Sequence, residues 1–408
     1  MFSHLIPESA DRPGDDPIFT LNADANARRA AGEDVLNSTL GALMEDDGSM
    51  SVMQSVFDAI KDVPPQQAAA YAPIIGNAGF LESVRRDLFG NSQLYSQSVA
   101  AATPGGTGAC YLSIVNFLSP GQSLLTTDYH WGPYGTLANH TGRGLCTFRM
   151  FDESGRLDVA SLETETANLV KAQGRVLLFL NTPCNNPTGY SMDGTDWAGV
   201  VRVLSEAAKK APITLLLDLA YEKFAHVDGF DWRPSVEELS AAGVNVILAW
   251  TASKAFTQYG ARVGACVAVV NDPSKLEAVG NALGYSCRGT WSNCNHLGML
   301  AVGQVLRDDT LRAKADGERD RLRTLLDERV VTFNRSAAEA GLEYPRYQGG
   351  FFVSVFTPDA AGTVAHMREN GVFVVPLRGA IRIALCATPM SDVERIVQAT
   401  AAAIAVGT

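Results

Sequence analysis

Residues 213–221 read Ile-Thr-Leu-Leu-Leu-Asp-Leu-Ala-Tyr, an almost unbroken apolar run that ends in a carboxylate and then a phenol. Apolar runs of similar length occur at residues 176–180, 244–250 and 263–270. Runs with so few polar interruptions are typical of strands that are buried on both faces of a parallel sheet. These four runs therefore predict the central strands of one sheet.

The intervals between the runs carry helical patterns. In residues 196–210 apolar side chains recur at helical spacing, with Trp197, Val200 and Leu204 on one side. Strand, helix and strand in alternation indicate βαβ units. We therefore predict the α/β class for the middle of the chain.

With 408 residues, the chain is longer than one hydrophobic core usually supports, so we expect about two domains. Residues 1–55 are interpreted as an N-terminal arm and part of a small domain, and 56–300 as the large domain. Residues 301–408 are interpreted as a C-terminal α+β lobe, with a long charged helix at about 312–340 and strand-like segments after it.

Composition limits the classes of function. The net charge of −11 is spread along the chain, which counts against nucleic acid or an anionic membrane as the main partner. The seven cysteines contain no Cys-x-x-Cys pair, and the six histidines have no metal-ligand spacing, so we predict no disulfide framework and no metal. We see no secretory signal and no membrane-spanning run, and we expect a soluble cytoplasmic protein.

Polar residues follow three of the apolar runs. They are residues 181–189, which include Asn186, then Asp218 with Tyr221, then Thr251 with Lys254. Ligands of open α/β sheets bind beyond the carboxyl ends of the strands. An amide, a carboxylate, a phenol and an amine are therefore expected along one rim of the sheet.

Each of these side chains has an ordinary structural interpretation and a functional one. A lysine is usually a solvated surface charge, but Lys254 directly follows a buried strand, where an amine can act as a nucleophile toward an aldehyde. Asp218 is either a turn cap or the carboxylate that keeps a cofactor's pyridine nitrogen protonated. Tyr221 is either packing or, with Asn186, a hydrogen-bond partner of the cofactor's ring oxygen.

A glycine-rich turn at residues 104–110 precedes a helical stretch. Glycines at a helix start allow main-chain N–H groups to face an anion, although such turns are often only turns. No Gly-Lys-Ser/Thr follows, so this is not a nucleotide P-loop. Arg262, eight residues beyond Lys254, is the candidate for a bidentate contact to the same phosphate.

Taken together, these stretches resemble the fold-type I aminotransferases, and within them the aspartate/aromatic aminotransferase group. The stretches that carry the resemblance are residues 103–109, Asn-Pro-Thr-Gly at 186–189, Asp-Leu-Ala-Tyr at 218–221, Ser-Lys at 253–254 with Arg-Val-Gly-Ala-Cys at 262–266, and Trp-Ser-Asn at 291–293. Matching segments run from about residue 40 to 382.

The resemblance implies a mostly parallel, seven-stranded type of sheet between helices, a small α+β domain from both termini, and pyridoxal 5′-phosphate as the cofactor. It implies that Lys254 binds the cofactor as an imine and later moves a proton, that Asp218 pairs with the pyridine nitrogen, and that Asn186 and Tyr221 contact the ring oxygen. The remaining implied contacts to the cofactor are Gly106, Thr107, Thr251 and Arg262 to the phosphate, Trp131 stacked on the ring, and Tyr71 reaching a phosphate across a homodimer. At the substrate the resemblance implies Gly41, Trp131, Asn186 and Arg382, with Arg382 on the α-carboxylate.

Arg288 is expected to determine the class of substrate. It resembles the arginine that reaches from the other subunit to a distal carboxylate, which fits aspartate, glutamate or 2-oxoglutarate; the alternative is an interface ion pair. Trp291, the pair Cys294-Asn295, and Tyr134 depart from the family pattern and suggest a reshaped pocket. An aromatic substrate therefore stays open beside a dicarboxylic one.

The predicted reaction moves an amino group between an L-amino acid and a 2-oxo acid. One alternative is a lyase, decarboxylase or oxidase on the same scaffold, because the cofactor site is the same for all of them. A second alternative is a sensor without catalysis. The first 55 residues have no basic helix-turn-helix pattern, which counts against a DNA-bound sensor.

Overall fold

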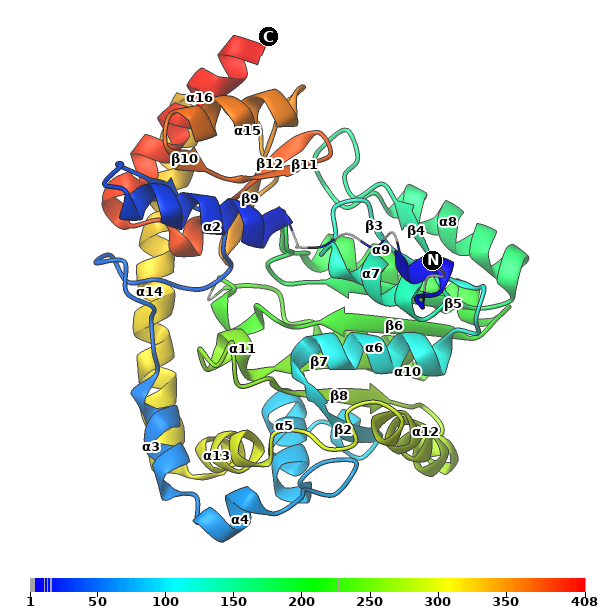
Figure 1. Cartoon of the computed structure of the whole chain (residues 1–408). Helices are drawn as coiled ribbons and strands as arrows, with labels where there is room; N and C mark the ends of the chain where they lie inside the picture. Colours follow the sequence, from blue (N-terminus) through cyan, green and yellow to red (C-terminus); the bar gives the residue numbers. More distant parts are fainter. Residues whose placement is uncertain (1–3, 11, 13, 15–16, 227, 408) are drawn as a thin grey trace. The chain divides into compact units, whose positions relative to one another are not determined.

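A computed structural model describes residues 4–10, 12, 14, 17–226 and 228–407 of the chain (Figure 1). It divides into two compact units. Unit 1 comprises Met1–Met50, Glu328–Tyr344 and Phe352–Thr408, and unit 2 comprises Ser51–Asp327 and Pro345–Phe351. The domain boundaries expected from the sequence, after residues 55 and 300, stay predictions.

Unit 2 is built on a seven-stranded sheet with the strand order β2-β8-β7-β6-β5-β3-β4 (Figure 1). The strands are β2 (Ser98–Pro104), β3 (Ser123–Thr127), β4 (Gly144–Phe148), β5 (Val176–Asn181), β6 (Ile213–Asp218), β7 (Asn245–Thr251) and β8 (Val263–Val269). All neighbouring pairs are parallel except those that β8 makes with β7 and β2. The predicted mostly parallel α/β sheet is therefore confirmed.

The four predicted central strands are β5 to β8. Every residue of β5, β6 and β8 is buried, which explains why these runs have so few polar interruptions. Strand β8 runs antiparallel because only the short helix α11 (Ala252–Ala255) and a loop separate it from β7, with no crossover helix.

The helices of unit 2 are α3 (Gln54–Asp62), α4 (Pro65–Ala69), α5 (Ala78–Phe89), α6 (Gly105–Phe117), α7 (Pro133–His140), α8 (Val159–Gln173), α9 (Gly194–Ala208), α10 (Arg233–Ala241), α12 (Leu276–Arg288) and α13 (His296–Arg307), and α14 (Asp309–Glu339) begins here and continues into unit 1. Most helices of unit 2 flank the sheet, whereas α3 and α4 pack on α13 (Figure 1). Helix α6 packs on β7 and β8, and its residues Ala109, Leu112 and Ile114 are fully buried in the main core.

Unit 1 contains a three-stranded antiparallel sheet of β11 (Val375–Leu377), β12 (Ala380–Ala384) and β9 (Phe352–Phe356). Strand β1 (Leu36–Asn37) pairs in parallel with β10 (Val372–Phe373). Its helices include α1 (Pro7–Ala10), α2 (Pro17–Ala30), α15 (Ala360–Glu369) and α16 (Val393–Gly407). The fully buried Arg329 donates to the carbonyl oxygens of Met44 and Cys386, which connects α14 to both ends of the chain within this unit.

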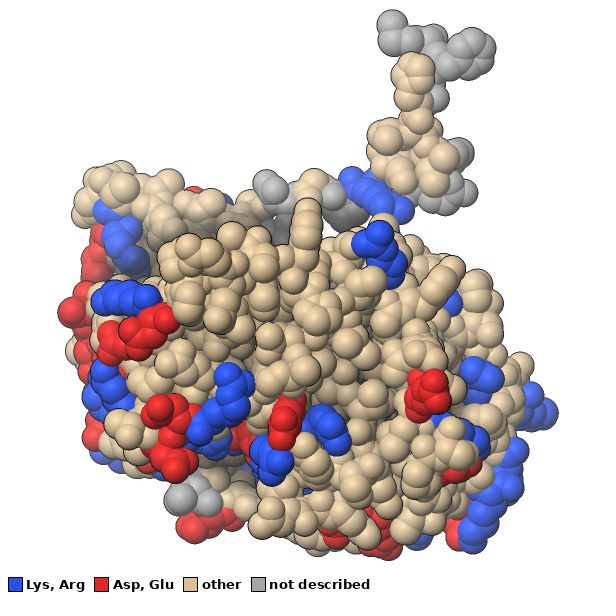
Figure 2. All heavy atoms as spheres, turned by 90° about the horizontal axis from the view of Figure 1, so that it is seen from below, with Lys and Arg blue, Asp and Glu red and all other residues tan. Residues whose placement is uncertain are grey.

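Acidic and basic side chains are interspersed on the face shown in Figure 2, with broad areas between them where neither is drawn. This agrees with a net charge that is spread along the sequence. Within the described residues, we find no helix with the length and apolar character needed to span a bilayer.

Candidate active site

The ends of three neighbouring strands form the centre of the site. Asn181 ends β5, and its partner in the register, Asp218, ends β6. The Asn181 side chain donates to the Asp218 carbonyl oxygen at 2.8 Å and accepts from the Asn186 N–H at 2.6 Å. Parallel pairing therefore brings the loop with Asn186 next to Asp218, as the sequence predicts.

Asp218 is a buried carboxylate with a donor on each oxygen. Its side chain accepts from the Tyr134 hydroxyl at 2.7 Å and from the Ala220 N–H at 3.1 Å, and the residue is 7% exposed. Burial raises the pKa of Asp218, while the two hydrogen bonds and the positive charge of Lys254 act in the opposite direction. Such a carboxylate is suited to a cationic partner.

Lys254 lies in α11, directly beyond β7. The Thr251 hydroxyl caps this turn by accepting from the Ser253 N–H at 3.1 Å. The Lys254 Nζ lies 5.9 Å from the ring centre of Tyr221 and 4.7 Å from that of Tyr259. The Asn186 amide in turn donates to the Tyr221 hydroxyl at 3.4 Å. The predicted amine, phenol, amide and carboxylate are therefore all in one group.

An anion-binding cradle lies at the start of α6. Because the N-cap residue is Pro104, no side chain in the described part of the chain caps this helix, which leaves its first N–H groups to a ligand. Gly105 has φ +71°, and a Cβ there would lie 2.5 Å from Nη2 of Arg262. A Cβ on Gly264 would lie 2.6 Å from the Gly105 main chain. Glycine at both positions therefore makes the close approach of Arg262 to the helix start possible.

Four residues predicted for a phosphate meet at this cradle. Gly106 faces Thr251, since a Cβ on Gly106 would lie 3.7 Å from the Thr251 Cβ. Arg262 donates to the Pro104 carbonyl oxygen at 3.1 Å, and desolvation lowers its pKa from the ordinary value. Thr107 follows in the first turn of α6. A guanidinium beside uncapped N–H groups fits a phosphate group.

These features fit pyridoxal 5′-phosphate. The cradle suits its phosphate, Asp218 its pyridine nitrogen, Lys254 its aldehyde, and Tyr221 with Asn186 its ring oxygen. Trp131 is half-buried, with its ring centre 5.5 Å from that of Tyr134 in an edge-to-face contact, on the same side of the sheet end.

Gly41 and Arg382, predicted at the substrate, come together within unit 1. The Arg382 guanidinium lies 4.4 Å from the ring centre of Phe352 and donates to the Thr39 carbonyl oxygen at 2.7 Å. A Cβ on Gly41 would lie 2.5 Å from the tip of the same Phe352 ring. Phe352 therefore forms a surface shared by the two residues, which sequence reasoning did not anticipate.

Among the described residues, no hydrogen bond, ion pair or ring contact joins Tyr71 or Arg288 to the group around Lys254 and Asp218. The Tyr71 side chain is 94% exposed, although its loop is fixed on both sides. The Asn293 side chain bonds to the N–H and to the carbonyl oxygen of Ala72, and His296 contacts the Ala70 carbonyl oxygen at 2.8 Å. Tyr71 is therefore an exposed aromatic residue on a loop whose main chain is held on both sides of it.

Arg288 ends α12 and donates to the Ser292 hydroxyl at 2.6 Å. Ser292 has φ +61°, a left-handed conformation that is uncommon for serine and that shapes this loop. The guanidinium is therefore oriented by a residue four positions later in its own chain.

Sequence reasoning did not assign Asn181 or Asn293 a role, and it noted Tyr134 only as a departure. The role of Asn181 could have been predicted, because Asn181 is the first polar residue after an apolar run. Asp218 has the same position in the next strand. The role of Asn293 could not have been predicted, since its partner Ala72 is 221 residues away.

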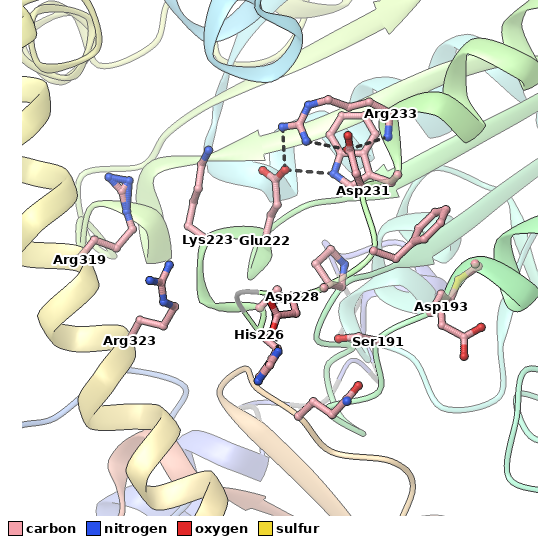
Figure 3. A pocket seen from close by; sticks show the side chains of 18 of the residues that line it. Ser191, Asp193, Glu222, Lys223, His226, Asp228, Asp231, Arg233, Arg319 and Arg323 are labelled. Atoms are coloured by element: carbon pink, nitrogen blue, oxygen red, sulfur yellow. Dashed lines mark hydrogen bonds and ion pairs between the residues drawn. The ribbon is translucent and has the colours of Figure 1, made fainter.

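A separate cavity of about 860 Å³ lies in unit 2 (Figure 3). Arg319 and Arg323 extend toward it from α14, and Glu222 with Arg233 lie on another side. These charges are paired locally: Arg233 with Glu222 at 3.2 Å, Arg323 with Asp320 at 3.1 Å and Arg319 with Asp316 at 2.5 Å. Among the described residues that line it, none is predicted to contact the cofactor.

The sequence matches the family model of aminotransferase class I and II over residues 33–399. It is 26% identical to the aromatic-amino-acid aminotransferase of Escherichia coli (strain K12) over 97% of this chain and 99% of that protein. It is 28% identical to an aspartate aminotransferase of Pseudomonas aeruginosa over 94% of this chain and 96% of that protein.

Solved structures give the same result. An aminotransferase from Anaerococcus prevotii superposes with a TM-score of 0.92 and 30% identity, covering 99% of this chain and 100% of that one. An aromatic-amino-acid aminotransferase from Burkholderia pseudomallei, covalently bound to pyridoxal phosphate, superposes with a TM-score of 0.82 and 25% identity, covering 98% and 100%.

Proposed function

The chain belongs to the aminotransferase class I and II family, and on that premise we propose a homodimeric enzyme whose two active sites each use residues of both subunits. Its cofactor is pyridoxal 5′-phosphate and its reaction is transamination. The observation that carries the site assignment is the group formed by Lys254, Asp218 and Tyr221 beside the cradle at the start of α6.

We propose the following cofactor contacts. Gly106, Thr107, Thr251 and Arg262 bind the phosphate, Asp218 pairs with the ring nitrogen, and Asn186 and Tyr221 contact the ring oxygen. Trp131 stacks on the ring and Tyr71 of the partner subunit contacts the phosphate. When bound, the cofactor supplies an electron sink that stabilises negative charge at the substrate Cα.

The residues of the chain supply binding and proton transfer. Lys254 would hold the cofactor through its Nζ. The same amine would serve as the base that moves the proton at the substrate Cα. Burial raises the pKa of Asp218, and its two hydrogen bonds oppose this shift, so the carboxylate would pair with a protonated ring nitrogen.

The proposed substrates are aspartate, glutamate or an aromatic L-amino acid as donor and a 2-oxo acid such as 2-oxoglutarate as acceptor. Arg382 is proposed to bind the α-carboxylate through a bidentate contact, with Gly41 lining the pocket. Arg288 of the partner subunit is proposed to bind a distal carboxylate. The names of the relatives, both aromatic and aspartate aminotransferases, agree with either donor.

The proposed homodimer agrees with the exposed side chain of Tyr71 on a held loop, and with Arg288, whose guanidinium donates to Ser292 and not, within the described residues, to a residue of its own chain's site. We propose a cytoplasmic location, which agrees with seven free cysteines in the described residues.

Absorption spectroscopy tests the proposed function. The purified protein is titrated separately with L-glutamate, L-aspartate and L-phenylalanine, with Lys254→Ala as the inactive control. We expect the visible band of the lysine-bound cofactor to convert to that of the amine form of the cofactor, with release of one 2-oxo acid, and a second 2-oxo acid to restore it. Lys254→Ala should lose turnover by several orders of magnitude, since it removes the group that moves the proton.

Two other outcomes would contradict the proposal. Consumption of amino acid without the amine form of the cofactor would indicate a lyase, decarboxylase or oxidase. A visible band that no amino acid changes would indicate a sensor.

A further inference from the structure

Tyr134 lies at the back of the site, where it contacts two of the residues proposed for the cofactor. Its side chain is fully buried, and its hydroxyl donates to Oδ2 of Asp218 at 2.7 Å. Its ring makes edge-to-face contacts with Trp131 at 5.5 Å and with Phe179 of β5 at 5.1 Å. One side chain therefore contacts both the proposed ring-nitrogen partner and the proposed stacking residue.

The position of Tyr134 is fixed by its own element. It lies in the first turn of α7, after Pro133, and its N–H donates to the Trp131 carbonyl oxygen at 3.0 Å. The ring is enclosed by the main core of unit 2. A phenol held in this way has few alternative orientations for its hydroxyl group.

We propose that Tyr134 is a positioning residue that favours the ionised form of Asp218 and orients its carboxylate toward the ring nitrogen. This inference rests on the proposed function. Since a hydrogen bond from a neutral phenol stabilises the anion of Asp218, it keeps the shared proton on the ring nitrogen instead of on the carboxylate.

The ionisable groups around Asp218 agree with this role. They are Tyr134 on α7, Cys110 on α6, and Tyr221 and Lys254 beyond β6 and β7. Burial and the Asp218 charge raise the pKa values of Tyr134 and of Cys110 well above their ordinary ranges. The Tyr134 hydroxyl therefore keeps its proton at neutral pH, where it donates to Asp218.

The test is Tyr134→Phe, which removes the hydroxyl and keeps the ring that packs on Trp131 and Phe179. Tyr190→Phe is the matched control, because the buried Tyr190 hydroxyl donates to Oδ2 of Asp196 at the same 2.7 Å. The apo proteins are reconstituted with pyridoxal 5′-phosphate labelled with ¹⁵N in the ring. The dissociation constant, the ring ¹⁵N chemical shift, kcat and KM are then measured, together with the melting temperature of each apo protein.

We expect Tyr134→Phe to raise the cofactor dissociation constant about 10-fold or more, because the lost bond is made to a charged group. Its ring ¹⁵N signal should move toward that of the unprotonated nitrogen, and kcat should fall while KM changes little. Tyr190→Phe should lower the melting temperature to a similar extent and leave the ¹⁵N signal and the dissociation constant unchanged.

The role of Tyr134 is wrong if Tyr134→Phe has the dissociation constant and ¹⁵N shift of the unaltered protein, or if Tyr190→Phe alters both equally. A protein that binds no pyridoxal 5′-phosphate at all would overturn the proposed function instead. The two failures are therefore distinguishable.

Discussion

Arg262 combines two features that are unfavourable for folding alone. Its φ of +54° is uncommon for a residue with a side chain, and its guanidinium is partly desolvated, which lowers its pKa. Both features place the guanidinium against Gly105 at the start of α6. Strain and desolvation at a cationic side chain are reasonable where an anionic ligand compensates for them.

Arg262→Lys should therefore weaken cofactor binding more than it changes stability. A lysine keeps the charge but loses the two-pronged geometry, and we expect the pyridoxal 5′-phosphate dissociation constant to rise about 10-fold. Fluorescence titration of the apo protein measures this constant. Arg202→Lys, at an exposed ion pair with Glu163 at 2.9 Å, is the control and should leave it unchanged. An unaltered constant for Arg262→Lys would remove Arg262 from the phosphate site.

The residues at strand ends could be predicted because each follows a buried run within a few positions. Asp218, Thr251 and Lys254 are of this kind. Tyr134 contacts Asp218 across 84 residues, and its partner depends on how α7 packs against the sheet. One sequence gives no direct measure of such contacts, so the hydrogen bond became visible only in the structure.

At the scale of elements, Asp193 both caps the N-terminus of α9 and takes part in a network of ion pairs. Asp193 caps α9 by accepting from the N–H groups of Thr195 and Asp196, and it pairs with Arg156 at 2.6 Å and Arg346 at 2.8 Å. Partial burial by itself would raise its pKa, but the hydrogen bonds from the two arginines and the main chain hold the pKa well below the ordinary value.

Asp193→Asn should destabilise the protein by about 1 kcal/mol at pH 7, because asparagine keeps the cap but loses both ion pairs, which are partly exposed. Since the pKa of Asp193 is lower in the folded state, its contribution is present above the unfolded pKa of about 4 and is lost as the pH falls through the folded pKa. The difference in unfolding free energy between Asp193→Asn and the unaltered protein should therefore become smaller below about pH 4.

Urea unfolding midpoints of the apo proteins at several pH values measure this difference. Asp359 caps α15 by accepting from the Gly362 N–H. Asp359→Asn is therefore the control for loss of a capping carboxylate. If the loss of stability caused by Asp193→Asn grows as the pH falls, the stabilising role of the ionised Asp193 is wrong.

Composition as well as burial decided which strands could be predicted from the sequence. Strands β5 to β8 were predicted because burial on both faces removes polar residues from them. Strands β2, β3 and β4 were not: β2 contains three successive alanines, which have low strand propensity, and β4 is only partly buried. Their place in the sheet depends on pairing with strands far away in sequence, such as β2 with β8.

At the scale of the whole molecule, a single copy of the chain holds two separate sets of site residues. Lys254, Asp218 and Arg262 belong to unit 2, and Gly41 and Arg382 to unit 1. Tyr71 and Arg288 also belong to unit 2, and among the described residues neither makes a hydrogen bond, ion pair or ring contact with the set there. The proposal gives them a role in a second copy, and this claim of a shared site is central to the account.

Mixing two inactive variants tests that claim most directly. Lys254→Ala and Arg288→Ala are purified, dissociated and reassociated together. Native mass spectrometry gives the fraction of heterodimer. The activity is measured as the transfer of ¹⁵N from L-aspartate to 2-oxoglutarate. A heterodimer has one intact site if Lys254 of one subunit works with Arg288 of the other. Random reassociation should then restore about a quarter of the activity of the unaltered protein, from parents that have almost none. A mixture that contains heterodimers and stays as inactive as its parents would contradict a site shared between two copies.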